Sequence, residues 1–409
     1  MKDAILVLNA GSSSIKFSLF HGFCAPEPQI ALKGQIEGIG VRPRFIAKGP
    51  EGKALADRSW EGDGGADRES LLAFLLQWIG EQVEDDGLLA VGHRVVHGGA
   101  QHEEPVLITD ELMVDLRAQI PFFPLHLPAN LAPIETIARL NPGLPQAACF
   151  DSSFHRTIPM VAQRYGLPRT LHDEGLRGYG FHGLSYEYIA QVMKGIDPAA
   201  AGGKTIVAHL GSGTSLCAIM GGKSAACTLG FSGLDGLLMG TRAGRLDPAI
   251  LLYLIQEKGM DAQALEDLLY RKSGLLGVSG VSSDMRDLLL SSHPHAREAV
   301  DLFVYRLVRE LGSMTAAAGG MDALVFTAGI GEHAPPIRAA VCGALAWLGL
   351  RLDEEANQQN ALLVSTPDSA IPVYVVPTNE ELMIARHTRR LAFSREQGTQ
   401  SERSAVFIR

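Results

Sequence analysis

Short apolar runs separated by a polar turn open the chain and predict a β-hairpin. Residues 5–20 read ILVLNAGSSSIKFSLF: an apolar run, a turn of glycine and serine, and a second apolar run. In the second run Ile15, Phe17 and Leu19 fall on one side and Lys16 on the other, which is the period of a strand with one buried face.

Later segments alternate between helix and strand patterns. The apolar positions of ESLLAFLLQWIGEQV repeat every three to four residues and predict a helix at 69–83. Further helices are predicted at 128–140, within 247–270, at about 295–318, and after Thr378, with Thr378 as N-cap and Glu381 completing a capping box. Continuous apolar runs predict buried strands at 145–150, at 322–331 ending in a glycine turn, and at 371–376.

The opening pattern recurs about 200 residues later. Residues 205–220 read TIVAHLGSGTSLCAIM, again an apolar run, a turn of small residues and an apolar run. Two such hairpins in a chain that mixes strands and helices predict an α/β fold with a duplicated domain and a cleft between the copies.

Composition narrows the class of protein. A chain of 409 residues favours two domains, and 46% hydrophobic with 20% charged residues is ordinary for a globular protein. The net charge of −9, without a basic block, disfavours nucleic acid and anionic membranes as partners. Five scattered cysteines, no signal-peptide pattern and no apolar run of about 18 residues predict a cytoplasmic protein.

The two hairpin turns have the composition of phosphate-binding turns. Glycine allows backbone N–H groups to point at an anion, serine adds hydroxyl donors, and Lys16 adds a positive charge. A plain hairpin with a surface lysine would explain the first turn alone. The second matching turn, and the stretch TAGIGEH after another strand, favour phosphate binding.

Two charged residues follow predicted strands in the first part of the chain. GHRVVHGG places Arg94 between glycines, where it suits a carboxylate or phosphate group; a surface ion pair is the alternative. ACFDSSFHRTIP places Asp151 after an apolar strand, where acids of α/β active sites often lie; capping of a turn is the alternative.

Glycine-rich segments in the second part present further candidates. RGYGFHGLS surrounds His182 with glycines, and LLMGTRAGRLDPA places Arg242 in a loop before a helix, where it could reach a transferred phosphoryl group. Asp284 and Arg286 would share one side of an extended segment and suit a nucleoside; a surface ion pair is the alternative. Glu380 begins the last predicted helix, a position that acids favour in any helix.

Taken together, these stretches resemble the acetate kinase family, within the superfamily of acetate and sugar kinases, heat-shock ATPases and actin. The resemblance runs from residue 6 to about 388 and is carried by nine ordered stretches: LNAGSSSIKFSLF, GHRVVHGG, FDSSFHRTIP, GYGFHGLS, HLGSGTSL, MGTRAGRLDPA, SGLLGVSGVSSDMRD, FTAGIGEH and PTNEELMIARHT.

The resemblance implies two RNase H-like domains around a cleft, expected at 1–150 with 381–409 and at 151–380, and a homodimer. It implies Mg²⁺-dependent, reversible transfer of a phosphoryl group between ATP and acetate, giving ADP and acetyl phosphate, a precursor in acetyl-CoA biosynthesis; Mn²⁺ is an alternative metal. Propionate kinase is the alternative within the family. A non-kinase ATPase or phosphohydrolase is the alternative outside it.

The resemblance also assigns roles to individual residues. It implies catalytic roles for Asp151, His182 and Arg242, and metal binding by Asn9 and Glu380. Substrate binding falls to Arg94 and to a small apolar pocket of Val96, Leu125 and Phe181. The implied nucleotide-binding residues are Ser12, Ser14, Lys16, His209, Leu210, Gly211, Ser212, Gly213, Asp284, Met285, Arg286, Gly329, Ile330, Gly331, Glu332 and His333.

Four positions depart from the family pattern. Ser212 and His333 replace asparagines in nucleotide segments, Gly233 replaces a proline, and Arg245 replaces an acid. His333 leaves the preferred phosphoryl donor open. Gly233 removes bulk near the apolar pocket, and because one methylene is worth only about 1–3 kcal/mol there, acetate and propionate are both expected to react.

The chemistry argues against Asp151 as a base. A carboxylate substrate is already ionised at neutral pH, so it needs charge neutralisation and alignment rather than deprotonation. We therefore expect Asp151 to orient an arginine or the magnesium shell.

Overall fold

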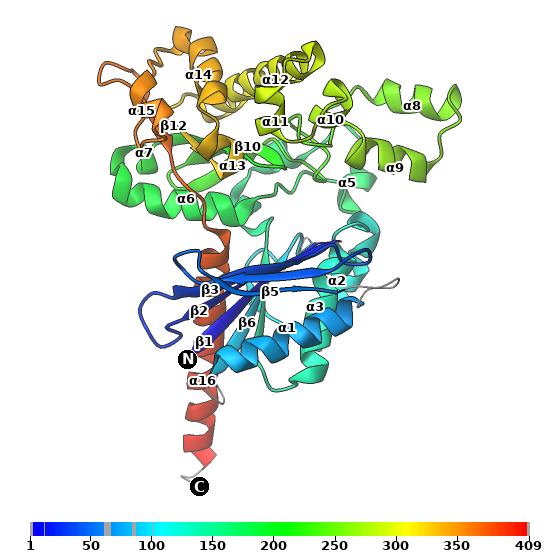
Figure 1. Cartoon of the computed structure of the whole chain (residues 1–409), viewed down its shortest axis with the longest axis vertical. Helices are drawn as coiled ribbons and strands as arrows, with labels where there is room; N and C mark the ends of the chain where they lie inside the picture. Colours follow the sequence, from blue (N-terminus) through cyan, green and yellow to red (C-terminus); the bar gives the residue numbers. More distant parts are fainter. Residues whose placement is uncertain (1–2, 12, 61–66, 84–86, 100, 407–409) are drawn as a thin grey trace. The chain divides into compact units, whose positions relative to one another are not determined.

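The computed structural model describes residues 3–11, 13–60, 67–83, 87–99 and 101–406, with side chains as far as Phe393. The chain divides into two compact units (Figure 1). Unit 1 comprises Met1–Ser153 and Asn379–Arg409, and unit 2 comprises Phe154–Thr378. The expected boundaries at 150 and 381 differ slightly, with the result that Asp151 and Glu380 belong to unit 1.

Unit 1 is built on one mixed sheet with the strand order β5-β4-β3-β2-β1-β6-β8-β7. Strands β1 to β5 form an antiparallel meander, whereas β6 and β8 run parallel to β1. The strands are β1 Ala4–Ala10, β2 Ser14–His21, β3 Gln29–Glu37, β4 Arg44–Lys48, β5 Ala54–Ser59, β6 Leu88–Val95, β7 Val106–Leu107 and β8 Gln146–Phe150.

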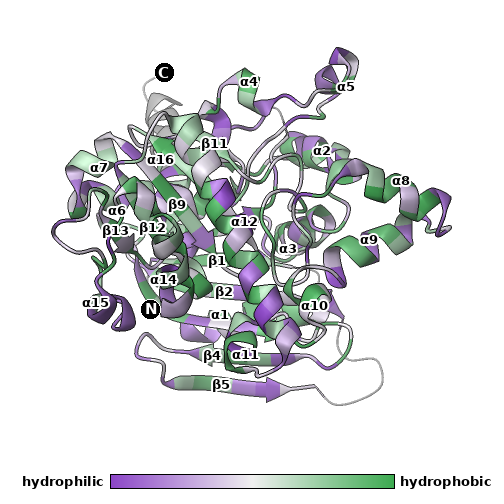
Figure 2. Cartoon of the chain, turned by 90° about the horizontal axis from the view of Figure 1, so that it is seen from above, coloured by the Kyte–Doolittle hydropathy of each residue, from purple (hydrophilic) through white to green (hydrophobic). Residues whose placement is uncertain are grey.

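Helices cover both faces of this sheet. They are α1 Arg68–Gln82, α2 Asp110–Ala118, α3 Leu127–Leu140 and α16 Glu380–Val406, with a 3₁₀ turn at Ile120–Phe122. Leu6 and Leu8 of β1 join a core with apolar residues of α1 and α3, while α16 packs against β1, β6 and β8. The edge strand β5 is mostly exposed, with an apolar first half and a hydrophilic second half (Figure 2). The charged residues Asp57 and Arg58 in the second half disfavour pairing with other chains.

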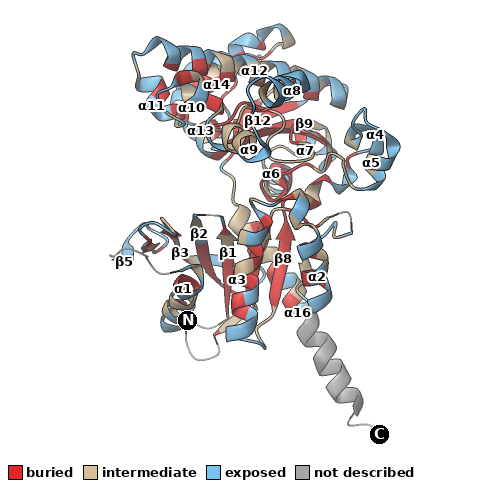
Figure 3. Cartoon of the chain, turned by 90° about the vertical axis from the view of Figure 1, so that its right-hand side faces the viewer, coloured by how far each residue is buried: buried red, intermediate tan, exposed pale blue. Residues whose placement is uncertain are grey.

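Unit 2 contains a five-stranded sheet in the order β11-β10-β9-β12-β13. All of its strands except β11, at one edge, are buried along most of their length (Figure 3). They are β9 Lys204–Leu210, β10 Thr214–Met220, β11 Lys223–Cys227, β12 Ala323–Thr327 and β13 Val373–Val375. Strands β9 to β11 are antiparallel, and β12 and β13 run parallel to β9.

The long helix α12 packs against β9, β10 and β11, and α6 packs against β9. The helices of unit 2 are α4 Met160–Gln163, α5 Arg169–Asp173, α6 Gly183–Ile196, α7 Pro198–Gly202, α8 Pro248–Gln256, α9 Ala262–Arg271, α10 Gly274–Ser279, α11 Met285–Leu290, α12 Pro294–Ala318, α13 Ala328–His333, α14 Pro335–Ala344 and α15 Glu354–Gln358. Further 3₁₀ turns lie at Ser153–Thr157 and Ala346–Leu348.

The two sheets repeat one topology, which confirms the predicted duplicated α/β fold. The order β3-β2-β1-β6-β8 in unit 1 corresponds to β11-β10-β9-β12-β13 in unit 2. In each unit a three-stranded antiparallel meander is followed by two parallel strands, and the hairpin with the glycine and serine turn begins the meander. In the described part of the chain, no helix is long and apolar enough to cross a membrane.

Three local predictions were wrong. Helix α16 begins at Glu380 and is capped by Asn379, whose side chain accepts from Leu382 N, so the N-cap is not Thr378. The expected glycine turn after β12 is the short helix α13, and the expected extended segment near 284–286 begins α11, with Asp284 as its N-cap.

Candidate active site

The carboxyl ends of three parallel strands bring the polar residues of unit 1 together. Asn9 lies near the end of β1, Arg94 near the end of β6, and Asp151 directly after β8. These strands are neighbours in the order β1-β6-β8, so their ends meet at one edge of the sheet, where α/β folds commonly bind ligands. Glu380, the first residue of α16, comes within 3.9 Å of Arg94.

Asp151 holds the guanidinium group of Arg94 with both carboxylate oxygens. Arg94 Nε donates to Asp151 Oδ1 at 2.9 Å, Nη2 donates to Oδ2, and Nη1 donates to Asn9 Oδ1 at 3.3 Å. The Asp151 side chain is 2% exposed and that of Arg94 25% exposed. Both oxygens of this buried carboxylate fix the guanidinium of Arg94, while the expected role of Asp151 in the reaction stays a prediction.

Burial and neighbouring charges shift the ionisation of this group of residues. Burial alone would lower the pKa of Arg94, but Asp151 and Glu380 outweigh it and raise that pKa. Burial raises the pKa of the Glu380 carboxyl to about 7; Arg94 opposes this rise and Asp151 adds to it. A cation beside Glu380 would favour its ionised form.

The oxygen atoms of unit 1 suit a divalent cation of the Mg²⁺ type. Asn9 offers an amide oxygen, and Glu380 offers a carboxylate. Burial disfavours the ionised form of this carboxylate, which a bound cation would restore. Among the described residues no three His, Cys, Asp or Glu side chains form a metal cluster. That is compatible with Mg²⁺, which proteins usually hold with one or two carboxylates while substrate phosphates and waters complete the shell.

The first phosphate-type turn lies beside these residues in the fold. Asn9 and Lys16 are direct cross-strand partners, so their side chains share one face of the β1–β2 hairpin. Lys16 is exposed and Ser14 is half-buried. The turn closes through the Gly11 N–H, which donates to Ser14 O at 2.8 Å. The predicted nucleotide-binding residue Ser12 lies outside the residues that the structure describes.

Asn130 is a site residue that the sequence analysis missed. Its buried side chain accepts from Val96 N at 2.9 Å and donates to Ala10 O at 2.7 Å, thereby joining the ends of β1 and β6. The sequence offered one signal, a polar residue on the apolar side of the helix at 127–140. Its two partners are too distant along the chain to be inferred from a pattern.

The local sequence of unit 2 forces His182 into an unusual conformation. His182 adopts φ +58°, a left-handed conformation that is rare for a residue other than glycine, and directly precedes α6. Gly180 has φ +78°, and a Cβ there would lie 2.5 Å from the ring of His155. The glycines of the stretch GYGFHG thus allow the chain to turn and present His182.

His182 and Arg242 meet at the second phosphate-type turn. A Cβ added to Gly213 would lie 3.2 Å from Arg242 Nη2 and 3.3 Å from His182 Nε2. Arg242 Nη1 donates to Gly233 O at 2.7 Å, which fixes the guanidinium. The turn between β9 and β10 therefore has two side-chain nitrogens directed at it, as a phosphate site requires.

The remaining predicted nucleotide-binding residues differ in burial and in the groups that they could present to a ligand. Leu210 and Met285 belong to the hydrophobic core of unit 2, so only their backbone could contact a ligand. Glu332 accepts from Ala328 N and Thr378 N, whereas His333 is 72% exposed. Asp284 pairs with its neighbour Arg286 at 2.6 Å on the surface.

The other predicted residues divide between the two units. Of the apolar pocket, Val96 and Leu125 are half-buried in unit 1, and Phe181 is 4% exposed in unit 2; the pocket itself stays a prediction. His209 and Gly211 belong to the second hairpin, and Ser212 is exposed at its tip. Gly329, Ile330 and Gly331 lie in α13.

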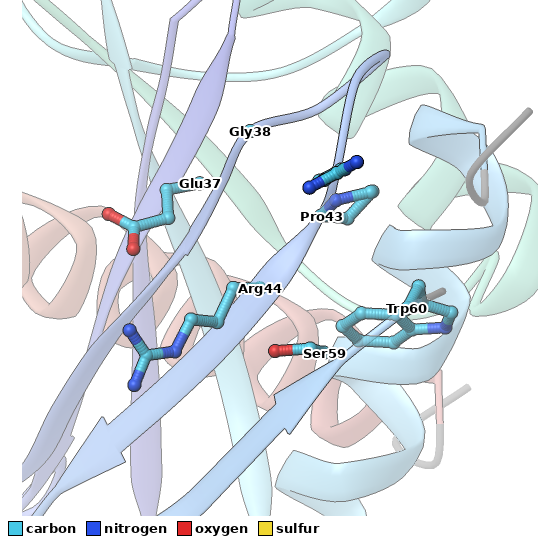
Figure 4. Close-up of a pocket in the computed structure, with 7 residues that line it drawn as sticks. Glu37, Gly38, Pro43, Arg44, Ser59 and Trp60 are labelled. Carbon is cyan, nitrogen blue, oxygen red and sulfur yellow. The ribbon is translucent and has the colours of Figure 1, made fainter. Parts of the chain in front are cut away.

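A cavity of about 830 Å³ lies elsewhere in unit 1 (Figure 4). It is lined by the turn after β3 and by the end of β5, including Arg44 and Trp60. Arg44 already pairs with Asp57 at 2.6 Å, and none of the predicted site residues lines the cavity. We therefore do not assign the active site to it.

Comparisons with known proteins extend over both units. The model of the acetokinase family matches residues 4–386. An acetate kinase of Rhodopseudomonas palustris is 52% identical over 396 residues, which cover 96% of this chain and 99% of the relative. The crystal structure of a propionate kinase from Francisella tularensis matches with a TM-score of 0.88 at 35% identity, covering 95% and 100% of the two chains. The structure of Porphyromonas gingivalis acetate kinase matches with a TM-score of 0.85 at 35% identity, covering 95% and 99%.

Proposed function

This chain belongs to the acetokinase family, and from that premise we propose that it is an acetate kinase. An oxygen of the acetate carboxylate attacks the terminal phosphorus of ATP, the bond from that phosphorus to the ADP oxygen breaks, and acetyl phosphate and ADP leave. The same steps run in reverse. No proton needs to be removed from the substrate, because acetate is ionised at neutral pH.

The observation that carries the proposal is the position of Arg94 against Asp151. Among the described residues, three of the five N–H groups of Arg94 donate to Asp151 and Asn9. One N–H remains on each terminal nitrogen, and this pair matches the two oxygens of a carboxylate. We therefore assign acetate binding to Arg94 and its orientation to Asp151.

Unit 2 supplies the residues for the phosphoryl donor. His182 Nε2 and Arg242 Nη2 both approach Gly213, where they can donate to the oxygens of the transferred group. The segments at 209–213, 284–286 and 329–333 are assigned to the rest of ATP. Bound Mg²⁺, or Mn²⁺ in its place, would neutralise phosphate charge, and Asn9 and Glu380 would hold it.

Propionate kinase is the second candidate, because one of the matching crystal structures carries that name. Gly233, where the sequence predicts a larger pocket, accepts from Arg242, and a Cβ there would lie 2.9 Å from Arg242 Nη1. Glycine at this position therefore leaves room for the guanidinium of Arg242 as well as enlarging the predicted pocket. Both acids remain expected substrates.

We also propose that the protein is a cytoplasmic homodimer that uses helix α8 as part of its interface. Within the described chain none of the α8 side chains is buried, although the helix carries no charged residue (Figures 2 and 3). Its exposed apolar residues are Ile250, Leu252, Tyr253 and Ile255. An uncharged apolar face can meet its own copy about a two-fold axis without bringing like charges together.

Trapping of the acyl phosphate with hydroxylamine tests the proposed activity. Purified protein with ATP and Mg²⁺ would receive acetate, propionate or butyrate in parallel, and a further arm would replace ATP with pyrophosphate because of His333. Hydroxamate from acetate is expected, with a lower yield from propionate. A higher rate with propionate would favour the second candidate. Release of ADP without hydroxamate and without dependence on the acid would exclude both kinases.

A further inference from the structure

Two buried hydroxyl groups lie behind His182. Ser215 Oγ is 2.8 Å from His182 Nδ1, and Tyr186 Oη is 2.5 Å from the same Ser215 Oγ. Ser215 belongs to β10 and Tyr186 to α6, and both side chains are 0% exposed. The ring of His182 also stacks on that of His209, with centroids 4.2 Å apart.

Counting protons shows that this chain of hydrogen bonds has two possible directions. Ser215 Oγ has one proton and can accept two hydrogen bonds, but among the described residues its buried hydroxyl has only these two partners. Its own proton is therefore satisfied only if it donates to one of them and accepts from the other. If Tyr186 donates to Ser215, then Ser215 donates to His182 Nδ1, and the proton of the neutral imidazole resides on Nε2. In the opposite direction Nδ1 carries the proton, and Nε2 is bare in the neutral ring.

Chemistry on both sides favours the first direction. A phenol is a stronger acid than an alkyl hydroxyl, so Tyr186 is the better donor of the two hydroxyls. On the other side, His182 Nε2 approaches Gly213 in the turn assigned to phosphate. Phosphate oxygens accept hydrogen bonds, so a bare Nε2 would repel them, whereas an Nε2–H would donate to them.

We propose that Tyr186 and Ser215 are positioning residues that fix His182 as the neutral Nε2–H tautomer and aim it at the transferred phosphoryl group. The inference rests on the proposed function, since it requires His182 to contact that group. It adds two residues to the site, neither of which the sequence analysis identified. Both hydroxyls are buried behind the histidine, so their effect on the transferred group passes through its ring.

The test combines kinetics with the tautomer of His182. The variants S215A and Y186F are expected to lower kcat by about 10- to 100-fold, the range found when a metal-binding histidine loses the partner that orients it. KM for ATP and acetate should stay within about 2-fold, and S215T should restore activity. T205V is the matched control, because Thr205 also uses a buried hydroxyl, toward Ala200 O, in the same sheet.

Nuclear magnetic resonance of ¹⁵N-histidine-labelled protein supplies the second measurement, with the His182 signal assigned through H182Q. Wild type should show the Nε2–H form, and S215A should show a mixture of tautomers. Adding S215A to H182Q should cost no further activity. Unchanged kcat in both S215A and Y186F, or an Nδ1–H form in wild type, would overturn the inference. Absence of hydroxamate from wild type would instead overturn the proposed function.

Discussion

At the residue level, the pair Arg94 and Asp151 is the centre of the proposed acetate site. Asp151 accepts from two nitrogens of Arg94, and in the proposed site the outer edge of the guanidinium binds the substrate. The sequence predicted both residues, because each follows an apolar strand. Their contact could be expected from the parallel order of β6 and β8, but its two-oxygen geometry could not.

We expect D151N to weaken use of acetate far more than use of ATP. The amide keeps the shape but removes the charge and one acceptor, and loss of one partner from such a pair costs about 2–5 kcal/mol. The value of kcat/KM for acetate should therefore fall by about 30-fold or more, while KM for ATP and the Mg²⁺ dependence change little. Steady-state kinetics with each ligand varied would measure this.

The variant E135Q is the matched control for D151N, because Glu135 pairs with Arg117 on the surface. It should behave like wild type. If D151N instead raised the Mg²⁺ requirement and spared acetate, Asp151 would act on the metal shell rather than on Arg94.

A second residue-scale effect concerns His93, the buried neighbour of Arg94. Burial lowers the pKa of His93 to about 4, although its hydrogen bond with Gln146 at 2.7 Å opposes the shift. The folded histidine thus stays neutral where the unfolded one, with a pKa near 6.5, takes up a proton. Stability is therefore full above about pH 6.5 and is lost as pH falls toward 4.

We expect protonation of His93 in the unfolded chain to lower the free energy of unfolding by about 3 kcal/mol as the pH falls from 7 to 4. Urea unfolding at a series of pH values would compare wild type with H93Q, which cannot titrate. The difference between the two free energies should change by about that amount over this range. If the unfolding free energies of wild type and H93Q changed in parallel with pH, His93 would not contribute to the pH dependence of stability.

At the scale of elements, Gly92 determines how closely α16 can approach β6. A Cβ at Gly92 would lie 2.2 Å from Thr388 Oγ1 and 2.6 Å from Ile384 Cγ2, both on α16. The same helix begins with Glu380, so its position also sets that of a site residue. The sequence predicted the strand and the helix but gave no sign that they touch at this glycine.

We expect G92A to destabilise the protein by about 1–3 kcal/mol, since the added methyl must push α16 away. The variant G80A should have the opposite effect. A Cβ at Gly80 would meet nothing within 4 Å, and replacing a glycine of a helix with alanine raises the free energy of unfolding by about 0.5–1 kcal/mol. Thermal unfolding should therefore show a lower Tm for G92A and a higher Tm for G80A. Equal Tm values would contradict the close packing.

Short helices were the elements that the sequence did not predict. The segment AGIGEH contains two glycines, which disfavour helix, yet it forms α13. The buried Arg338 donates to the carbonyls of Gly331 and Glu332 at 2.8 and 3.0 Å, and Glu332 accepts from Ala328 N. Side-chain hydrogen bonds therefore hold this helix. Their geometry depends on distant partners, since Thr378 N donates to Glu332 and Arg338 is fixed by Asn357, and apolar periodicity does not report such contacts.

At the scale of the whole molecule, the repeated topology was the most predictable property. The two glycine and serine turns alone, at 11–14 and 211–213, indicated that the sheets of both units contain the same hairpin. The strands differ widely in sequence otherwise, because any apolar residues of suitable size satisfy a buried sheet. The supporting residues Asn130, Tyr186 and Ser215 were unpredictable for the same reason: their partners lie far along the chain.

The oligomeric state is a second property of the whole molecule. If α8 forms part of a two-fold interface, L252E would place a carboxylate in the apolar face of both copies. Light scattering after size exclusion should then give the mass of two chains for wild type and of one chain, 43.8 kDa, for L252E. Leu290, 88% exposed on α11, provides the control, and L290E should remain a dimer. A monomeric wild type would contradict the proposal.

The discontinuity of unit 1 has a consequence for how the protein is made. Unit 2 is one continuous segment, whereas unit 1 combines the first 153 residues with the last helix. A ribosome releases the chain from its amino end. The strands of unit 1 therefore emerge before unit 2, and α16 can cover their sheet only after all of unit 2 has been synthesised. A chain cut short after Thr378 would retain the donor residues of unit 2 but lack both that cover and Glu380. The helix that completes unit 1 is therefore synthesised only after all of unit 2.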